Sequence, residues 1–300
     1  MFHLATLIKF RQMKHIQLYV FMSVAMGLVS CNFTGEKIWI DEYPSFQSAY
    51  IKARQVEVFL PPDYDPSFTY DVLYIHDGQN VFNPHTAFGG EAWELEKALI
   101  SLQKKQRIRP AIVVAVWNTP LRMQEYMPGK PEDKVLAAAR NKGWEGEILS
   151  DKYLKFLVEE LKPFIDKTYS TNTERESTFI MGSSMGGLIS FYALAEYPDV
   201  FGGAACISTH WPALDGVFLE YVAENIPLPG RHKLYFDYGT ATIDALYEPY
   251  QVKVDSMMAA AGFSEGKDWV SKKFKGAGHS EKAWRKRVHI PLEFLLSVDR

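Results

Sequence analysis

The stretch Thr178–Gly187, with the sequence TFIMGSSMGG, decides the fold that we expect for this chain. Its first four residues are mostly apolar and β-prone, and the amphipathic stretch Leu188–Tyr197 that follows favours a helix. Together they predict a strand, a tight turn and a helix. The turn carries the pattern Gly-x-Ser-x-Gly, with Gly182 and Gly186 flanking Ser184. Small residues are needed there because the serine of such a turn adopts a strained backbone conformation.

Ser184 is the predicted nucleophile, because this turn exposes its hydroxyl above the carboxyl end of the strand. The first N–H groups of a helix stabilise negative charge, so the backbone N–H of Met185 is the first predicted oxyanion donor. The alternative is a glycine-rich turn whose serines cap a helix. That alternative is common for an isolated match, but the strand, turn and helix context makes it the weaker interpretation. Ser183 lies one residue too early and is expected to pack.

Strand-like and helix-like segments alternate after Asn32, which predicts a mostly parallel central sheet flanked by helices in a single α/β domain. Strands are expected at Gln55–Leu60, Tyr70–His76, Ala111–Trp117, Ser177–Met181, Gly203–Ser208, Lys233–Tyr238 and Trp269–Phe274. Helices are expected at Ala92–Lys104, Asp151–Tyr169, Met185–Tyr197, Pro249–Ala261 and Glu281–Leu296. The segments 118–147 and 209–231 are expected to be irregular connections, the second overhanging the carboxyl ends of the strands.

His279 is the predicted general base. When a serine lies in a turn of this kind, its acid and then its histidine follow it along the chain, the histidine after the last strand. His279 follows the expected strand Trp269–Phe274 and the flexible loop Lys275–Gly278. The alternative is a surface or helix-capping histidine, but Ser280 is the better cap.

Two aspartates are candidates for the acid of a Ser-His-Asp triad. Asp244 lies in the loop after the expected strand Lys233–Tyr238, where a carboxylate can reach the imidazole from above the sheet. Asp237 lies within that strand and would have to reach across from it. We favour Asp244, and Asp237 stays open as the alternative acid or as an anchor for neighbouring loops.

The residues HDGQN at 76–80 end another expected strand. Gly78 lets the chain turn so that the backbone N–H of Gln79 can face the serine as the second oxyanion donor. His76 and Asp77 are adjacent, so their side chains diverge, and we expect them to shape the loop. The sequence carries no HExxH or CxxC pattern and no acidic cluster, so neither a metal nor a cofactor is expected.

The N-terminal segment has the pattern of a signal peptide. Basic residues precede the stretch Ile16–Val29, which is mostly apolar and too short to span a bilayer comfortably. The residues LVSC at 28–31 resemble a bacterial lipobox, in which Cys31 becomes the first mature residue and is acylated. We therefore expect a lipoprotein signal peptide over 1–31 and a single α/β catalytic domain over 32–300, exported across the inner membrane and held by a lipid anchor in the periplasm or at the cell surface. A simple secretory signal is the alternative.

The charge and the cysteine content of the chain limit the classes of partner and of cross-link that we expect. The formal charge is −3, and it becomes −6 when the three basic residues before Cys31 are removed. A mildly acidic chain without a basic cluster argues against nucleic acid. The other cysteine, Cys206, lies in an apolar run typical of a buried strand, so no disulfide framework is expected. The oligomeric state stays open.

With these residues identified, the chain resembles the Putative esterase (esterase D-like) family of α/β-hydrolases, which includes siderophore, feruloyl and acetylxylan esterases and mycolyltransferases. The residues that carry the resemblance, over most of Val56–Val298, are HDGQN at 76–80 with Phe82, Arg122 with Glu125, Tyr126 and Pro128, Gly182–Leu188, Tyr197, Pro198, Phe201, Gly202, Gly278–Glu281 and Trp284. The resemblance implies the α/β-hydrolase fold, Ser184, His279 and an acid after the seventh strand, and an oxyanion hole at Gln79 and Met185. It leaves the choice of aspartate open.

These observations predict a serine carboxylic ester hydrolase that works through an acyl-enzyme. Export points to acetyl or feruloyl esters of carbohydrates, or to ester siderophores, as substrates. Trp117, Tyr126, Trp144 and Trp211 could stack on sugar or phenolic rings, with packing under long loops as the alternative. An acyltransferase with the same triad, and a non-catalytic ligand-binding lipoprotein on a hydrolase fold, are the rival functions.

Overall fold

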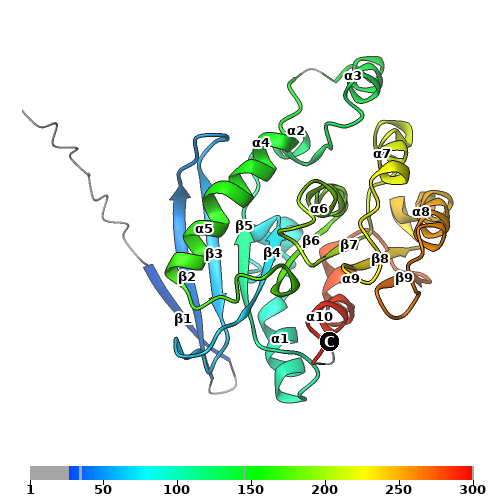
Figure 1. The fold of residues 1–300 in the computed structure, drawn as a ribbon. Helices are drawn as coiled ribbons and strands as arrows, with labels where there is room; N and C mark the ends of the chain where they lie inside the picture. Colours follow the sequence, from blue (N-terminus) through cyan, green and yellow to red (C-terminus); the bar gives the residue numbers. More distant parts are fainter. Residues whose placement is uncertain (1–26, 34–35, 145, 299–300) are drawn as a thin grey trace, which may run out of the picture.

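A computed structural model describes residues 27–33, 36–144 and 146–298, with side chains from Ile38 onward (Figure 1). In this part of the chain nine strands form one sheet, in the order β1-β2-β3-β5-β4-β6-β7-β8-β9. The strands are β1 (Gly27–Phe33), β2 (Glu36–Phe46), β3 (Arg54–Leu60), β4 (Asp71–His76), β5 (Ala111–Val116), β6 (Thr178–Ser183), β7 (Gly203–Ile207), β8 (Lys233–Gly239) and β9 (Trp269–Phe274).

The sheet is parallel from β5 through β4 and β6 to β9, and antiparallel from β1 to β5. The central strands β4, β5, β6 and β7 are buried along their whole length, because helices cover both faces of the sheet. Short apolar runs such as AIVVAV in β5 are typical of strands buried in this way. The predicted mostly parallel α/β architecture is confirmed.

Two layers of helices cover the sheet (Figure 1). One apolar core joins the sheet to α4, α5 and α6, and the other joins it to α1 and α10. The helices are α1 (Leu95–Lys104), α2 (Arg122–Tyr126), α3 (Glu132–Asn141), α4 (Ser150–Lys155), α5 (Lys162–Thr168), α6 (Met185–Glu196), α7 (Phe218–Glu224), α8 (Glu248–Ala260), α9 (Glu281–Arg285) and α10 (His289–Leu296). A π-helical segment, Phe156–Leu161, joins α4 to α5.

Five of the described elements were not predicted from the sequence, namely β1, β2, α2, α3 and α7. Helices α3 and α7 are short and lie within segments rich in proline and glycine, which hides their periodicity. The expected final helix is also divided, since a turn separates α9 from α10.

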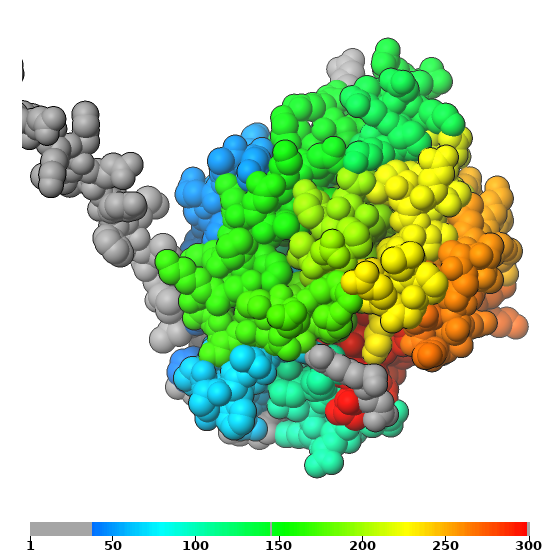
Figure 2. Space-filling model, in the orientation of Figure 1, coloured from blue at the N-terminus to red at the C-terminus, as the bar shows by residue number. Residues whose placement is uncertain are grey.

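The segments that carry α3 and α7 follow the carboxyl ends of β5 and β7 and lie side by side (Figure 2). Ion pairs join them on the surface, Lys134 to Glu220 and Lys142 to Asp215. Exposed pairs of this kind contribute little to stability, because solvent screens them. They show that the two long connections pack against each other.

The N-terminal strand lies at the outer edge of the sheet. β1 pairs with β2 in a register that sets Cys31 opposite Ile38. Because each strand from β1 to β5 is antiparallel to its neighbour, the last residues of β1 lie at the amino ends of the parallel strands. β1 begins at Gly27, inside the expected signal peptide, and the boundary at Cys31 stays a prediction.

Candidate active site

Ser184 connects β6 to α6 in the tight turn that the sequence predicted. Its backbone angles, φ 59° and ψ −121°, lie in a region that only a strained turn imposes on a non-glycine residue. A Cβ atom on Gly182 would lie 2.7 Å from the carbonyl carbon of Gly186, and one on Gly187 would lie 2.7 Å from Thr209 Oγ1. Glycine is therefore required at both positions, and Ser184 lies at the carboxyl end of β6.

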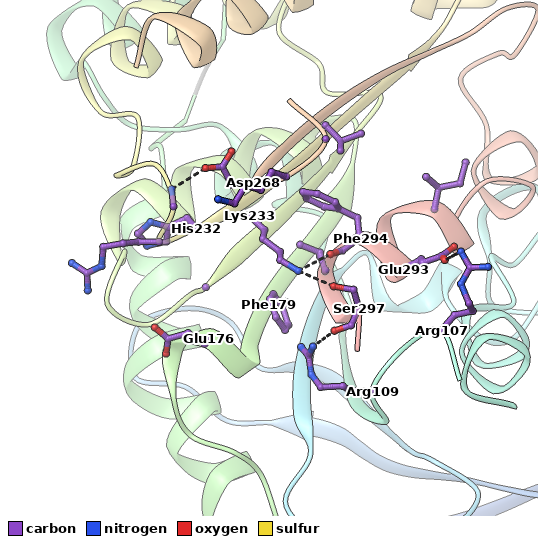
Figure 3. A pocket seen from close by; sticks show the side chains of 18 of the residues that line it. Arg107, Arg109, Glu176, Phe179, His232, Lys233, Asp268, Glu293, Phe294 and Ser297 are labelled. Atoms are coloured by element: carbon purple, nitrogen blue, oxygen red, sulfur yellow. Dashed lines mark hydrogen bonds and ion pairs between the residues drawn. The ribbon is translucent and has the colours of Figure 1, made fainter. Parts of the chain in front are cut away.

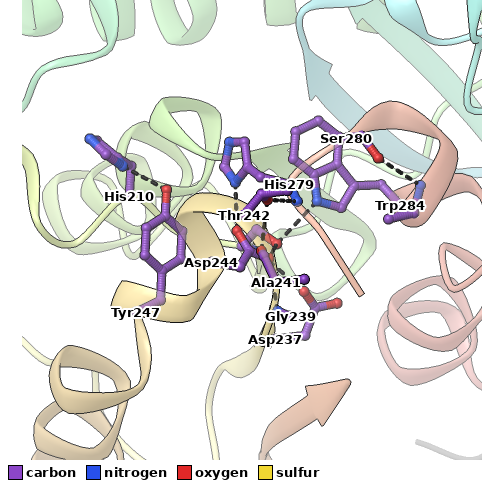
Figure 4. Close-up of polar contacts among 12 residues, drawn as sticks. His210, Asp237, Gly239, Ala241, Thr242, Asp244, Tyr247, His279, Ser280 and Trp284 are labelled. Atoms are coloured by element: carbon purple, nitrogen blue, oxygen red, sulfur yellow. Dashed lines mark hydrogen bonds and ion pairs between the residues drawn. The ribbon is translucent and has the colours of Figure 1, made fainter. Parts of the chain in front are cut away.

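His279 is held in the loop before α9. Its Nδ1 lies 2.6 Å from Asp244 Oδ1, and its backbone N–H donates to Thr242 Oγ1 at 2.8 Å (Figure 4). The ring of Trp284 meets the imidazole edge-on, with centroids 4.9 Å apart. Since Nδ1 is engaged by the carboxylate, Nε2 is the nitrogen left to act as a base.

Asp244 is buried on the helical turn Thr242–Leu246. Its second oxygen, Oδ2, accepts hydrogen bonds from Ser208 Oγ at 2.7 Å and from Gly239 N at 2.8 Å. Burial raises the pKa of Asp244, but the hydrogen bonds from His279, Ser208 and Gly239 outweigh it and hold that pKa below its ordinary value. Asp244 is therefore a carboxylate at neutral pH.

Asp237 has other partners. It lies within β8 and is fully buried, and it accepts from Arg287 Nη2 at 2.9 Å and Nε at 3.1 Å. Tyr235 OH and the backbone N–H of Ser208 complete its hydrogen bonds. Burial raises the pKa of Asp237, and Arg287 opposes that rise. The structure thus brings Asp244, and not Asp237, to His279.

The loop after β4 lies beside this turn. A Cβ atom on Gly78 would lie 2.7 Å from the carbonyl carbon of Ala115, so the chain can turn there only at a glycine. The carbonyl of Gln79 accepts from Thr86 Oγ1 at 2.8 Å, and its side-chain oxygen accepts from Asn118 N at 3.2 Å. These bonds fix the loop that was predicted to carry the second oxyanion donor.

A buried polar network underlies that loop. Asp77 binds Arg122 through two hydrogen bonds of 2.7 Å, and Asn118 Nδ2 donates to it at 2.6 Å. His76 Nδ1 lies 2.8 Å from Tyr153 OH, and burial lowers the pKa of His76 to about 3. Both residues shape the loop, as expected from the sequence, and His76 is neutral at pH 7.

Residues 48–290 match the protein family described as "Putative esterase". The chain belongs to this esterase family. It is a carboxylic ester hydrolase with the α/β-hydrolase fold, as the sequence predicted.

Relatives and solved structures agree with this assignment. The uncharacterized protein YbbA of Bacillus subtilis (strain 168) is 25% identical over 269 residues, which cover 82% of this chain and 94% of the relative. The ferri-bacillibactin esterase BesA of the same organism is 25% identical over 168 residues, which cover 53% of this chain and 55% of that relative. The structure of a ferulic acid esterase shares the fold, with a TM-score of 0.63 at 18% identity over 86% of this chain and 98% of that chain.

Two further side chains of the esterase lie at the site without having been predicted. Tyr247 OH lies 2.6 Å from His210 Nδ1 (Figure 4). It is also a hydrogen-bonding neighbour of the Ser184 side chain. Burial lowers the pKa of His210, and the electrostatic interactions with His279 and Arg122 lower it further. No spacing pattern marks either residue, because His210 and Tyr247 come from two separate loops.

The aromatic residues expected to contact substrate need a correction. Tyr126 and Trp211 are 0% and 1% exposed. Tyr126 OH accepts from the backbone N–H of Asp77, and Trp211 Nε1 donates to Gln251. Neither ring presents a face to the solvent because each completes the apolar core, so the expectation of substrate contact is wrong for both. Trp117 is half-buried and stays a prediction.

An open pocket lies at the other end of the sheet (Figure 3). It has a volume of about 740 Å³ and is lined by residues at the amino ends of strands, including Phe179, Lys233 and Asp268. None of the predicted catalytic residues lines it. Among the described residues, no group of three or more His, Cys, Asp and Glu side chains could hold a metal ion, and no helix there is long and apolar enough to cross a membrane.

Proposed function

We propose that this esterase cleaves its substrate through an acyl-enzyme on Ser184, with His279 as the general base and Asp244 as the acid. The observation that supports the proposal best is the 2.6 Å contact between His279 Nδ1 and Asp244 Oδ1. Both residues follow parallel strands, β9 and β8, whose carboxyl ends lie at the same edge of the sheet as the Ser184 turn. Asp237 is not proposed as the acid, because its oxygens are occupied by Arg287.

In the first half of the reaction, His279 Nε2 takes the proton of Ser184 as Oγ attacks the ester carbonyl carbon. The carbonyl oxygen becomes negative and is stabilised by the backbone N–H groups of Met185 and Gln79. Collapse of this intermediate breaks the bond to the alcohol, which leaves with the proton from His279.

In the second half, His279 takes a proton from water as the water oxygen attacks the acyl-enzyme, and it returns that proton to Ser184 as the acid leaves. Asp244 stabilises the imidazolium formed at both stages and fixes the proton on Nδ1. The strained φ of Ser184 holds its hydroxyl beside the helix N-terminus throughout.

The proposed substrates are esters outside the cytoplasm, with an acetyl or feruloyl group on a carbohydrate, or ester siderophores. A relative named as a ferri-bacillibactin esterase and a structure named as a ferulic acid esterase support these two classes. The lipobox at 28–31 supports export and a lipid anchor on Cys31. The half-buried Trp117 is the proposed aromatic substrate contact.

A panel of p-nitrophenyl acetate, acetylated xylan, a feruloyl sugar ester and a catecholate ester tests the proposal. Ser184→Ala should abolish turnover of every ester that the wild type cleaves. Ser183→Ala, which removes the buried neighbouring hydroxyl, is the matched control and should retain turnover. Unimpaired turnover by Ser184→Ala would contradict the proposal, and added alcohol that diverts product from acid to new ester would indicate an acyltransferase.

A further inference from the structure

The hydroxyl of Ser208 lies at the centre of a buried chain of polar groups behind the proposed triad. Ser208 follows β7 and is 0% exposed. Its Oγ lies 2.7 Å from Asp244 Oδ2, 2.8 Å from Arg287 Nη2 and 3.1 Å from Trp284 Nε1. One oxygen therefore contacts a carboxylate, a guanidinium and an indole at once.

The direction of each hydrogen bond follows from the chemistry of these groups. A guanidinium and an indole N–H can only donate, so Arg287 and Trp284 both donate to Ser208 Oγ. The single hydroxyl proton of Ser208 is then directed to Asp244, which can only accept when ionised. The order of donation is thus fixed from Arg287 through Ser208 to Asp244.

Ser208 is also hydrogen-bonded to the second aspartate, Asp237. The backbone N–H of Ser208 lies 3.1 Å from Asp237 Oδ1, and Asp237 holds the guanidinium of Arg287 through two hydrogen bonds. Arg287 and Asp237 are both buried, so their mutual orientation is determined by each other and not by solvent. The titratable groups that face Asp244 are His279, Tyr247 and His210. Arg287 and Asp237 lie behind it and are connected to it through Ser208.

We propose that Ser208 is a positioning residue of the esterase, which fixes the orientation of Asp244 toward His279 and connects that carboxylate to the buried Arg287–Asp237 pair. This inference rests on the proposed function, since it assigns Ser208 a role that acts through Asp244. With Oδ2 held by Ser208 and by Gly239, the other oxygen of Asp244 is left pointing at His279 Nδ1.

The backbone of Ser208 provides a way to separate the hydroxyl from the main chain. Its φ is 41°, in the left-handed region that favours glycine. Ser208→Ala removes the hydroxyl and keeps the strain, whereas Ser208→Gly removes the hydroxyl and relieves the strain. A role of the hydroxyl predicts the same kinetic loss in both variants, but a role of the backbone predicts recovery in the glycine variant.

We expect Ser208→Ala and Ser208→Gly each to lower kcat about 10- to 100-fold, the loss expected for a hydrogen bond to a charged group, with KM changed less than twofold. The acid limb of kcat/KM should move to higher pH, because loss of a donor raises the proton affinity of the His279–Asp244 pair. Ser150→Ala, which removes a buried hydroxyl far from the triad in sequence, is the control and should keep the wild-type profile.

The inference would be overturned if folded Ser208→Ala and Ser208→Gly had the wild-type kcat and an unmoved acid limb. It would also be overturned if kcat recovered in the glycine variant alone. If neither variant folds, Ser208→Cys replaces the hydroxyl that donates to Asp244 by a weaker thiol donor, and an unmoved acid limb there would overturn the inference equally. Failure of the proposed function would look different, because Ser184→Ala would then remain active.

Discussion

Replacing Asp244 by asparagine should disable the base of the esterase without disturbing its fold. Oδ2 of Asp244 accepts from both Ser208 Oγ and Gly239 N, so the amide oxygen of an asparagine must take that place. The amide nitrogen then faces His279 Nδ1 and donates to it. The imidazole is forced to carry its proton on Nε2, where it cannot accept one from Ser184.

The size of the effect follows from trapping the wrong tautomer. The equivalent change in a serine protease lowers kcat about 10⁴-fold, which corresponds to about 5.4 kcal/mol in the activation free energy. The folded structure should lose little, because Ser208 and Gly239 keep an acceptor. We therefore expect Asp244→Asn to lower kcat by several orders of magnitude, with KM and melting temperature close to those of the wild type.

Asp237→Asn is the matched control, since it makes the same chemical change within β8, the strand that precedes the Asp244 loop. It leaves the buried guanidinium of Arg287 without its counter-charge, which costs about 3–5 kcal/mol of unfolding free energy and lowers Tm by on the order of 10 °C. Steady-state kinetics below the melting transition should show that the folded fraction retains most of its kcat.

Measurements of ester hydrolysis and thermal unfolding on both variants distinguish Asp244 from Asp237 as the acid. A folded but inactive Asp237→Asn beside a nearly active Asp244→Asn would refute the assignment of the acid. A large loss of Tm in Asp244→Asn would refute the placement of the amide oxygen against Ser208.

Three more predictions follow from other parts of the chain. An organophosphonate should label Ser184 in the wild type, and mass spectrometry that found the adduct on Ser183 would move the nucleophile. Cys31→Ala should release the protein from the membrane fraction and change its electrophoretic mobility, whereas unchanged fractionation would remove the lipid anchor. Burial lowers the pKa of His76 to about 3. Between about pH 6.5 and 3 this histidine is therefore protonated in the unfolded chain and neutral in the folded chain. The free energy of unfolding should fall with acidification over that range, by up to about 1.4 kcal/mol per pH unit from this group. His76→Gln should flatten that dependence in urea unfolding, and equal slopes for both proteins would count against it.

The sequence was most informative where one local pattern determines both structure and chemistry. The turn around Ser184 could be predicted from its local pattern, and at Gly182 only glycine fits the close approach of β6 and α6. The strand order along the chain places His279 and the acid loop at the same edge of the sheet. Asp244 could be favoured over Asp237 for that reason alone.

The parts that could not be predicted depend on contacts between segments distant in the chain. Ser208 meets Trp284 and Arg287, which lie three residues apart but 76 and 79 residues further along the chain than Ser208. No periodicity in either segment reports on the other. The same holds for Tyr247 and His210. Burial of Trp211 is equally non-local, since it packs on Phe218 of α7, a helix that the proline-rich segment hides.

The position of the outer strand β1 determines where a lipid-anchored esterase would meet its substrate. Its last residues lie at the amino ends of the parallel strands, and Ser184 lies at the carboxyl ends. A lipid on Cys31 would put the bilayer and the reaction at opposite ends of the sheet, roughly 20 Å apart for a strand of six residues. The active site of an esterase anchored in this way would face the surrounding medium. It would therefore cleave soluble esters or ester groups attached to neighbouring polymers, and the lipid esters of its own bilayer would be out of its reach.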